Sequence, residues 1–316
     1  MIQKKRSFEN QLINLFWGLT RGSRLLTPYS DKFNKLGFKV VGFELSFYAY
    51  NRSQKATPDM ILESINLKES IITEWTQSET VSEGKINQIR KYINIDDESL
   101  RMFVSETCVE NRDVVLIIIP EAEKSYKQIL ESRNLSAILL VYHYPEDYLL
   151  EKKLNNFKVA ETEDFFKQPL KFERIPYSFP DINLSDLSKS LLVDNVVSTL
   201  IEILVKEDEG FEFNIQYFIQ RMLTKSFYNL LSANKRKNIA KVSKGIISDL
   251  LKQRYGADIL KRVNLDPPTW RIVMSRAERL KRIKSIRRRF GEFSNKIAGR
   301  VYQLSLFGQI EPGGES

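Results

Sequence analysis

Cysteine and histidine are almost absent from this chain of 316 residues, which contains one of each. The single cysteine, Cys108, excludes an internal disulfide framework and a zinc site built from cysteines. The single histidine, His143, excludes a histidine metal cluster, and any Ser/His or Cys/His nucleophile system would have to depend on it. We expect Cys108 to be a buried thiol and His143, which lies in an apolar run, to be a packed side chain.

Long hydrophobic runs are missing as well. No apolar run approaches the length of a membrane span, and the basic N-terminus leads into an amphipathic segment instead of the apolar core of a signal peptide. These absences indicate a cytoplasmic protein that does not enter a membrane. The composition, with 42% apolar and 28% charged residues, is that of a globular chain, and the length indicates about two domains.

The first half of the chain alternates between helical and strand patterns, which predicts an α/β domain over residues 1–145. The last two predicted strands flank a helix, so we expect them to be parallel neighbours joined by a right-handed crossover. Predicted helices cover Ser7–Leu19, a segment from about Glu83, and Glu123–Arg133; predicted strands cover Phe38–Tyr50, Met60–Leu67, Ser70–Trp75, Val114–Ile119 and Ile138–Tyr144.

The second half lacks strand signals. Four prolines between residues 145 and 180 predict a linker over 146–183 that carries short helical pieces. An all-α domain is expected over 184–310, followed by a disordered tail over 311–316. The predicted helices of this domain are Leu187–Val205, Ile215–Leu231, Ile239–Tyr255 and Ala277–Leu304.

Two carboxylates lie at the ends of neighbouring predicted strands. Asp59 follows Pro58 at the start of the second strand, and Glu74 ends the third. Paired carboxylates at a sheet edge provide the oxygen ligands that a hard divalent cation such as Mg²⁺ requires. Each residue alone also has a structural interpretation, because a Pro-Asp pair can simply open a strand and a glutamate can end one in solvent.

Together with the helix that follows, these residues resemble a known family. Pro58-Asp59, then Glu74-Trp75-Thr76, then Gln88 and Tyr92 in the pattern Gln-x-x-x-Tyr resemble the core of the PD-(D/E)XK nuclease superfamily, in its RecB-type subset. The resemblance implies a restriction-endonuclease-like mixed sheet flanked by helices. It also implies that Asp59 and Glu74 hold Mg²⁺ or Mn²⁺. Some members carry a helix-borne glutamate near the metal, which here corresponds to Glu9; the alternative for Glu9 is a first-turn glutamate favoured by the helix dipole.

Thr76 departs from the family pattern, because a lysine is expected two residues after the glutamate. A hydroxyl carries no charge near neutral pH and cannot stabilise a developing anion as an ammonium does. Lys85, near the start of the following helix, is the preferred substitute. Lys39 on the first strand and Lys68 on the hairpin are further candidates. The predicted catalytic set is therefore Asp59, Glu74, Lys85, Gln88 and Tyr92.

Positive charge is concentrated near the C-terminus. Between Arg271 and Arg300 there are eleven Lys or Arg against two Glu, a net charge equal to the +9 of the whole chain. We expect a basic amphipathic helix that binds the phosphates of nucleic acid, DNA rather than RNA. A solvated face, an acidic protein partner and a membrane surface are the alternatives. The predicted contacts to nucleic acid are Arg282, Lys284, Arg287, Arg288, Arg289 and Arg300.

Three functions are compatible with these features. The first is a magnesium-dependent endonuclease with an atypical active site, a type that resemblance places in mobile-element, restriction or phage-defence machinery. The second is a cleavage-deficient, nuclease-derived subunit that binds nucleic acid or protein partners in a larger complex. The third is an interaction protein in which Asp59 and Glu74 do not meet in space.

Overall fold

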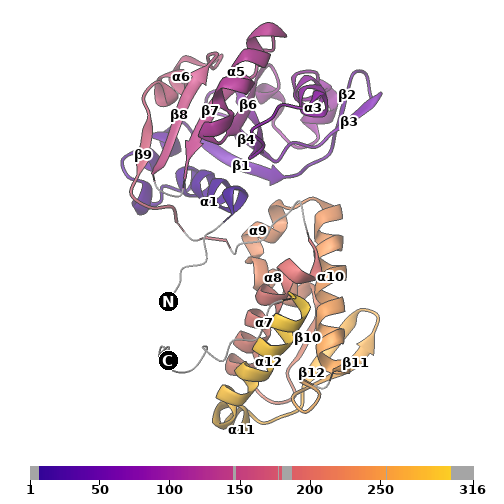
Figure 1. Ribbon diagram of the computed structural model, residues 1–316. Coiled ribbons are helices and arrows are strands. Elements are labelled where there is room, and N and C mark those ends of the chain that lie inside the picture. Colours follow the sequence, from indigo (N-terminus) through magenta and orange to yellow (C-terminus); the bar gives the residue numbers. More distant parts are fainter. Residues whose placement is uncertain (1–6, 145–146, 177, 180–186, 254, 300–316) are drawn as a thin grey trace, which may run out of the picture. The chain divides into compact units, whose positions relative to one another are not determined.

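The computed structural model describes residues 7–144, 147–176, 178–179, 187–253 and 255–299 (Figure 1). The chain divides into two compact units, Met1–Asp181 with Asn229–Ala233, and Ile182–Tyr228 with Asn234–Ser316. Each unit has its own buried core. The expected division into two domains is therefore present, although the first unit extends well beyond residue 145.

The first unit is built on a seven-stranded mixed sheet in the order β1-β4-β5-β6-β7-β8-β9. The β6–β7 ladder is parallel, as predicted, the β5–β6 ladder is parallel as well, and the outer ladders are antiparallel. The strands are β1 (Phe38–Phe43), β4 (Met60–Ser64), β5 (Glu69–Thr76), β6 (Asn111–Ile118), β7 (Ile138–His143), β8 (Tyr148–Leu154) and β9 (Leu170–Phe172), and a separate hairpin consists of β2 (Phe47–Ala49) and β3 (Gln54–Ala56).

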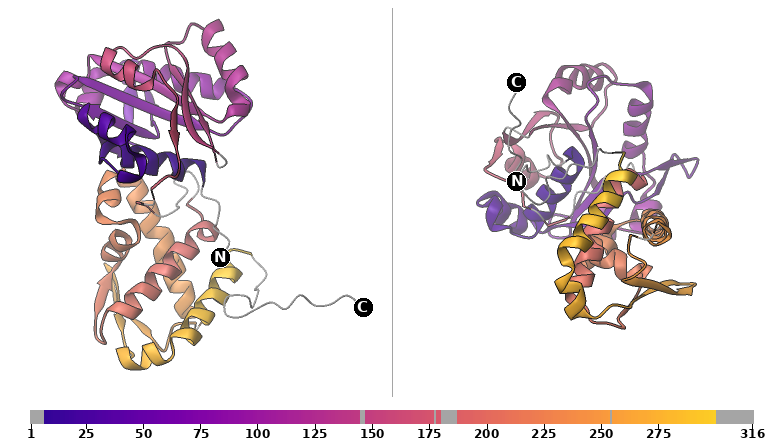
Figure 2. Two further views of the ribbon diagram at one scale, coloured as in Figure 1. Left: turned by 90° about the vertical axis from the view of Figure 1, so that its left-hand side faces the viewer. Right: turned by 60° about the horizontal axis from the view of Figure 1, so that its bottom comes forward.

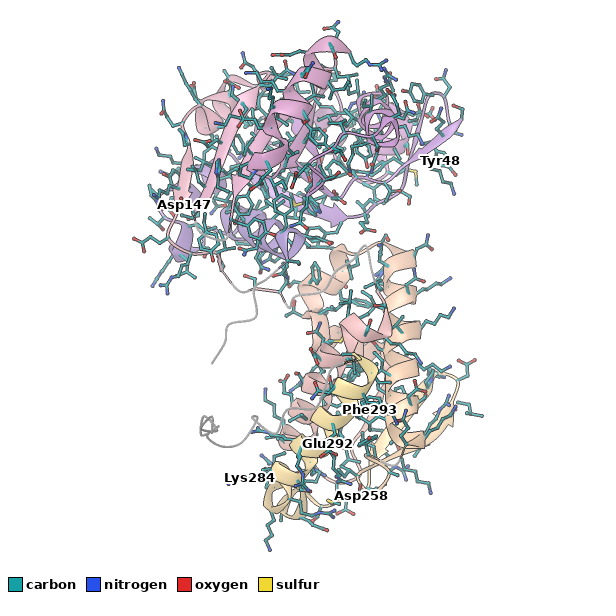
Figure 3. All side chains as sticks on the ribbon, in the orientation of Figure 1. Tyr48, Asp147, Asp258, Lys284, Glu292 and Phe293 are labelled. Atoms are coloured by element: carbon teal, nitrogen blue, oxygen red, sulfur yellow. The ribbon has the colours of Figure 1, made fainter. Side chains whose placement is uncertain are left out.

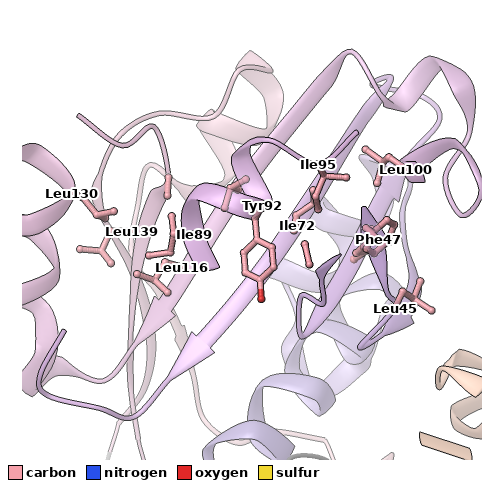
Figure 4. Close-up of a cluster of buried hydrophobic side chains, with 14 of the residues drawn as sticks. Leu45, Phe47, Ile72, Ile89, Tyr92, Ile95, Leu100, Leu116, Leu130 and Leu139 are labelled. Atoms are coloured by element: carbon pink, nitrogen blue, oxygen red, sulfur yellow. The ribbon is translucent and has the colours of Figure 1, made fainter. Parts of the chain in front are cut away.

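Helices cover both faces of this sheet. Val141 of β7 belongs to the apolar cluster beneath α3 and α5, whereas the next residue, Tyr142, points to the other face, where its ring lies 5.9 Å from that of Phe8 on α1. Figure 2 shows α1 in indigo and α5 in magenta on different sides of the sheet. The helices are α1 (Phe8–Thr20), α2 (Tyr29–Lys35), α3 (Glu83–Ile93), α4 (Asp97–Arg101), α5 (Glu123–Ser132) and α6 (Ala160–Phe166). The cluster under α3 and α5 includes Ile72, Ile89, Tyr92, Leu116 and Leu130 (Figure 4).

The prediction of a mixed sheet flanked by helices is thus confirmed, but the predicted linker over 146–183 is wrong. That segment contributes β8, α6 and β9, and its two strands complete the sheet. The physical reason is visible in β8, where only Leu150 is fully buried and the other side chains are half-buried. A strand near the edge of a sheet can carry charged residues, so its sequence shows no continuous apolar run.

The second unit is mainly helical, as expected. Thr224 ends the predicted helix over 215–231 early, and a further helix follows it. The unit also contains a small antiparallel sheet in the order β10-β12-β11, which the all-α prediction did not include. The elements are α7 (Lys189–Lys206), β10 (Glu212–Asn214), α8 (Ile215–Leu223), α9 (Lys225–Leu230), α10 (Ala233–Lys252), β11 (Leu260–Leu265), β12 (Pro268–Ile272), α11 (Arg276–Lys281) and α12 (Ile283–Ile297).

Three expectations concern the rest of the chain. Cys108 is buried, as predicted. No helix among the described residues combines the length and apolarity needed to cross a membrane. The tail over 311–316 lies outside the described residues.

Candidate active site

Asp59 and Glu74 lie close together at one end of the β4–β5 ladder. The last pair of this ladder is Met60 with Thr73, and just before it the Asp59 N–H donates to the Thr73 carbonyl at 3.0 Å. The Asp59 side chain reaches β5, where its Oδ2 accepts the N–H of Trp75, the residue after Glu74, at 2.7 Å. The charges of Asp59 and Glu74 act on each other. The two carboxyl groups predicted to form a pair therefore converge.

Helix α3 brings three polar side chains to this pair. The helix begins after Ser82, whose hydroxyl accepts the Lys85 N–H at 3.2 Å. From this start, Lys85, Gln88 and Tyr92 are spaced three and four residues apart, so they share one face of the helix. The Lys85 ammonium donates to Glu74 Oε1, and also to Gln88 Oε1 at 3.3 Å. The lysine predicted to replace the missing motif lysine thus contacts the predicted metal ligand.

Tyr92 holds the second oxygen of the same carboxylate. Its hydroxyl donates to Glu74 Oε2 at 2.7 Å and lies 3.0 Å from the Thr57 carbonyl, so one proton serves two acceptors. Gln88 Nε2 donates to the same hydroxyl at 2.5 Å. Burial raises the pKa of Tyr92 far above its ordinary value, and the charge of Glu74 raises it further. The phenol therefore stays protonated and acts as a donor to Glu74.

The environment of Asp59 disfavours its charge. Burial raises the pKa of this carboxyl well above its ordinary value, and the neighbouring charge of Glu74 raises it further. The Trp75 N–H, which donates to Asp59 Oδ2 at 2.7 Å, and the Lys85 ammonium act in the opposite direction. The uncharged form of Asp59 is thus favoured, and additional positive charge beside it would favour the charged form.

Of the other candidate residues of this region, one lies near the acidic pair and two lie away from it. Glu9 lies on α1, and its charge makes a minor contribution to the raised pKa of Asp59. Lys39 forms an ion pair with Glu63 at 3.0 Å, and Lys68 lies in the turn between β4 and β5, at the opposite end of the ladder from Asp59. Lys39 and Lys68 therefore do not join the site. Thr76 ends β5, and its hydroxyl accepts the Ser78 N–H at 3.2 Å.

The donor chemistry fits a hard divalent cation bound by two protein groups. Among the described residues there is no group of three or more His, Cys, Asp or Glu side chains arranged to hold a metal ion. Magnesium, however, is commonly bound by one or two carboxylates and keeps several waters. A cation between Asp59 and Glu74 would offset the repulsion that raises the pKa of Asp59. Thr57 contributes its backbone carbonyl to the site, where it accepts a hydrogen bond from the Tyr92 hydroxyl. No side-chain motif in the sequence indicates this contact.

The predicted nucleic-acid contacts lie in the second unit and have unequal surroundings. The expected single helix is wrong, because Arg271 lies in β12 and the helical part is divided at Arg282 into α11 and α12. Arg282 and Arg289 both bind Asp258, at 3.0 Å each. These two guanidinium groups therefore stabilise the fold around Asp258. Asp258 and Lys284 are labelled in Figure 3.

The remaining predicted contacts are more accessible. Lys284 and Arg287 are exposed and make no ion pair within the part of the chain that the structure describes. Arg288 lies 3.9 Å from Glu292. Arg300 lies outside the described residues. Only part of the predicted basic surface is therefore available to a ligand.

The fold and the site together define an α/β domain with an acidic pair, a lysine and a Gln-Tyr pair at one end of its β4–β5 ladder. Residues 8–180 match the family described as the MJECL32 domain, and the chain belongs to that family. The matched segment ends close to the boundary of the first structural unit, which includes β8 and β9. No curated protein and no solved structure matches the chain.

Proposed function

We propose that this protein is a magnesium-dependent phosphodiesterase of the PD-(D/E)XK type that cleaves DNA as an endonuclease in the cytoplasm. The observation that carries the proposal is the meeting of five residues chosen from sequence motifs. Glu74 of β5 is hydrogen-bonded to Lys85 and Tyr92 of α3, and Gln88 bonds both of these residues. Asp59, just before β4, lies close enough for its charge to interact with those of Glu74 and Lys85.

Each residue has a physical role in this proposal. Asp59 and Glu74 would hold Mg²⁺ or Mn²⁺, which when bound lowers the pKa of a coordinated water and polarises a phosphoryl oxygen. Tyr92 and Gln88 fix the orientation of the Glu74 carboxylate through their hydrogen bonds. Lys85 supplies positive charge beside the carboxylates, where negative charge develops on the phosphate during hydrolysis. Glu9 is a further carboxylate near the pair.

A second function is favoured by the two hydrogen bonds that the Glu74 carboxylate accepts. Both oxygens of Glu74 already accept hydrogen bonds, one from Lys85 and one from Tyr92. If Lys85 neutralises Glu74 permanently, the site does not bind a metal ion and does not cleave DNA. The protein is then a cleavage-deficient subunit that binds nucleic acid or protein partners in a larger complex. Either role is compatible with mobile-element, restriction or phage-defence machinery.

A plasmid-nicking assay in Mg²⁺ and in Mn²⁺ separates the two functions. The endonuclease proposal expects metal-dependent nicking by the wild type, which Asp59→Ala and Glu74→Ala abolish. Glu79→Ala is the matched control, because Glu79 is exposed in the loop that joins β5 to α3. Nicking that survives Asp59→Ala would overturn the assignment. Absence of nicking in either metal, with DNA binding retained, would favour the cleavage-deficient subunit.

A further inference from the structure

The second unit presents a long helix, α10, just before a β-hairpin. The elements run α7, β10, α8, α9, α10, β11 and β12, and β12 lies between β10 and β11 in the sheet (Figure 1). This order corresponds to a helix-turn-helix with a β-hairpin wing. In helix-turn-helix modules the last helix of the motif lies in the major groove of DNA. α10 holds the corresponding position.

The buried side of α10 is apolar and its opposite side is cationic. Ile239, Ser243, Ile246, Ile247 and Leu250 face the core of the unit. At 100° per residue, the side chains of Lys237, Lys241, Lys244, Ser248 and Lys252 gather on the other side of the helix. Lys237, Lys241 and Lys252 are exposed, and Lys244 is half-buried.

This lysine row is not compensated by acidic side chains. Within the described residues, none of the four lysines makes an ion pair. The one acidic residue of α10, Asp249, accepts a hydrogen bond from Lys189 of α7 at 2.6 Å. On α12, by contrast, Arg282 and Arg289 are bound to Asp258 and Arg288 lies near Glu292. Positive charge without an acidic partner among the described residues is therefore present on α10, as well as at Lys284 and Arg287 of α12.

The hairpin adds a rigid projection beyond the end of α10. The Arg262 guanidinium donates to the Asn264 and Leu265 carbonyls, both at 3.2 Å, which fixes the tip. Leu265 at this tip is 72% exposed, and Lys261 is exposed on the same strand. A fixed, exposed tip beside a cationic helix is suited to contact the backbone next to a groove.

We propose that the lysine face of α10, defined by Lys237, Lys241, Lys244 and Lys252, is a binding surface for duplex DNA. The row spans fifteen residue steps, or about 23 Å at 1.5 Å per residue, which allows contacts to several phosphates along a groove. The choice of DNA rests on the proposed function, whereas the surface itself does not require that the first unit cleaves. The predicted α12 contacts are secondary to it.

The test measures binding of the full chain to a fluorescein-labelled DNA duplex by anisotropy, in EDTA and over a range of salt concentrations. Lys237→Gln/Lys241→Gln/Lys244→Gln should weaken binding by about tenfold or more and lower the salt slope by about two to three units. Lys237→Arg/Lys241→Arg/Lys244→Arg keeps the charge and should retain affinity. Circular dichroism melting confirms that each variant is folded.

Two triple variants with the same charge change serve as comparisons. The control replaces Lys32, Lys35 and Lys55, which are exposed in the first unit, with Gln. The competitor replaces Lys284, Arg287 and Arg288 on α12 with Gln. A loss in the α10 variant no larger than in the control, or a loss confined to the α12 variant, would overturn the inference.

Two further results would also count against it. Tighter binding to single-stranded RNA than to the duplex would assign the surface to another ligand. If the wild type showed no detectable binding to duplex DNA, the lysine face of α10 would not be a DNA-binding surface. Because EDTA prevents metal-dependent cleavage, retained binding without nicking in the plasmid assay would refute only the endonuclease proposal.

Discussion

The ammonium group of Lys85 donates to the carboxylate of Glu74, which lies eleven residues earlier and on a different element. Both side chains are shielded, at 17% and 4% exposure. The contact joins the start of α3 to the end of β5. A lysine that a helix supplies therefore lies beside Glu74.

Lys85 should contribute most of the cationic stabilisation of the reaction. If the site is active, Lys85→Ala should slow metal-dependent nicking by about a hundred- to a thousandfold, because one preorganised electrostatic donor is lost. Thr76→Lys should raise nicking above the wild type, since it restores a lysine at the motif position. Lys91→Ala, on the same helix, is the control and should leave the rate unchanged. Equal rates for Lys85→Ala and Lys91→Ala would remove Lys85 from the mechanism.

Tyr92→Phe should affect metal affinity and stability together. The substitution leaves Glu74 Oε2 and the Thr57 carbonyl without the hydroxyl that links them. We expect about 1–3 kcal/mol lower unfolding free energy in urea and a metal affinity reduced by about tenfold to a hundredfold. Tyr50→Phe is the control because Tyr50 is 38% exposed. An unchanged Mn²⁺ affinity in calorimetry would show that Tyr92 does not support the ligand.

A second buried carboxyl, Glu69, should make stability depend on pH. Glu69 is fully buried at the start of β5, where Thr162 donates to its Oε2 and Oε1 has no hydrogen-bond partner within the described residues. Burial and the neighbouring Asp113 raise the pKa of Glu69 to about 8. The folded state therefore keeps a proton that the unfolded chain releases near the ordinary glutamate pKa. Stability should fall as the pH rises from that range to about 8.

Glu69→Gln tests this dependence, because glutamine imitates the protonated carboxyl. The variant should melt at a higher temperature than the wild type at pH 8 and show a flatter profile between pH 5 and pH 8 in thermal scans. Glu121→Gln, at an exposed position, should follow the wild-type curve. A wild-type melting temperature that rises over this interval would contradict the protonated state of Glu69.

The buried Arg279 should be essential to the second unit. Its guanidinium donates to the Leu204 carbonyl at 2.8 Å and to the Met274 and Glu207 carbonyls. Arg279→Met leaves three carbonyls unpaired, and we expect a loss of about 3 kcal/mol or more. Chemical denaturation should show this loss, whereas Lys281→Met, at an exposed position, should have little effect. Near-equal stability of the two variants would contradict the structural role of Arg279.

The central part of the fold was predictable because its signals are local. The run Val114–Ile119 is continuous and apolar since β6 is buried on both faces, and the spacing of Ile86 and Ile89 marks the buried side of α3. The site was predictable for a related reason. Asp59, Glu74 and the α3 residues lie at ends of elements whose types and order the sequence indicates, so their convergence followed from topology.

The errors arose where tertiary contacts override local patterns. β8 carries Glu151, Lys152 and Lys153, whose charges are satisfied by neighbours such as Glu163 and His143. These contacts form only when the chain is folded, so in the sequence the segment resembles a polar linker. The break at Arg282 is similar, because Asp258, from the loop before β11, binds that guanidinium and no local signal reports it. The lysines of α10 were not recognised because acidic residues elsewhere cancel their charge in the total.

Binding of Mn²⁺ to the metal-free protein is the most direct test of the acidic pair, and titration with detection of free Mn²⁺ by electron paramagnetic resonance measures it. We expect saturable binding at one site, which Asp59→Asn and Glu74→Gln abolish and Glu79→Gln leaves intact. Binding should become tighter as the pH rises, because the proton on Asp59, whose pKa is raised, competes with the metal. Wild-type binding that is absent, or that persists in Asp59→Asn, would contradict a metal site between Asp59 and Glu74.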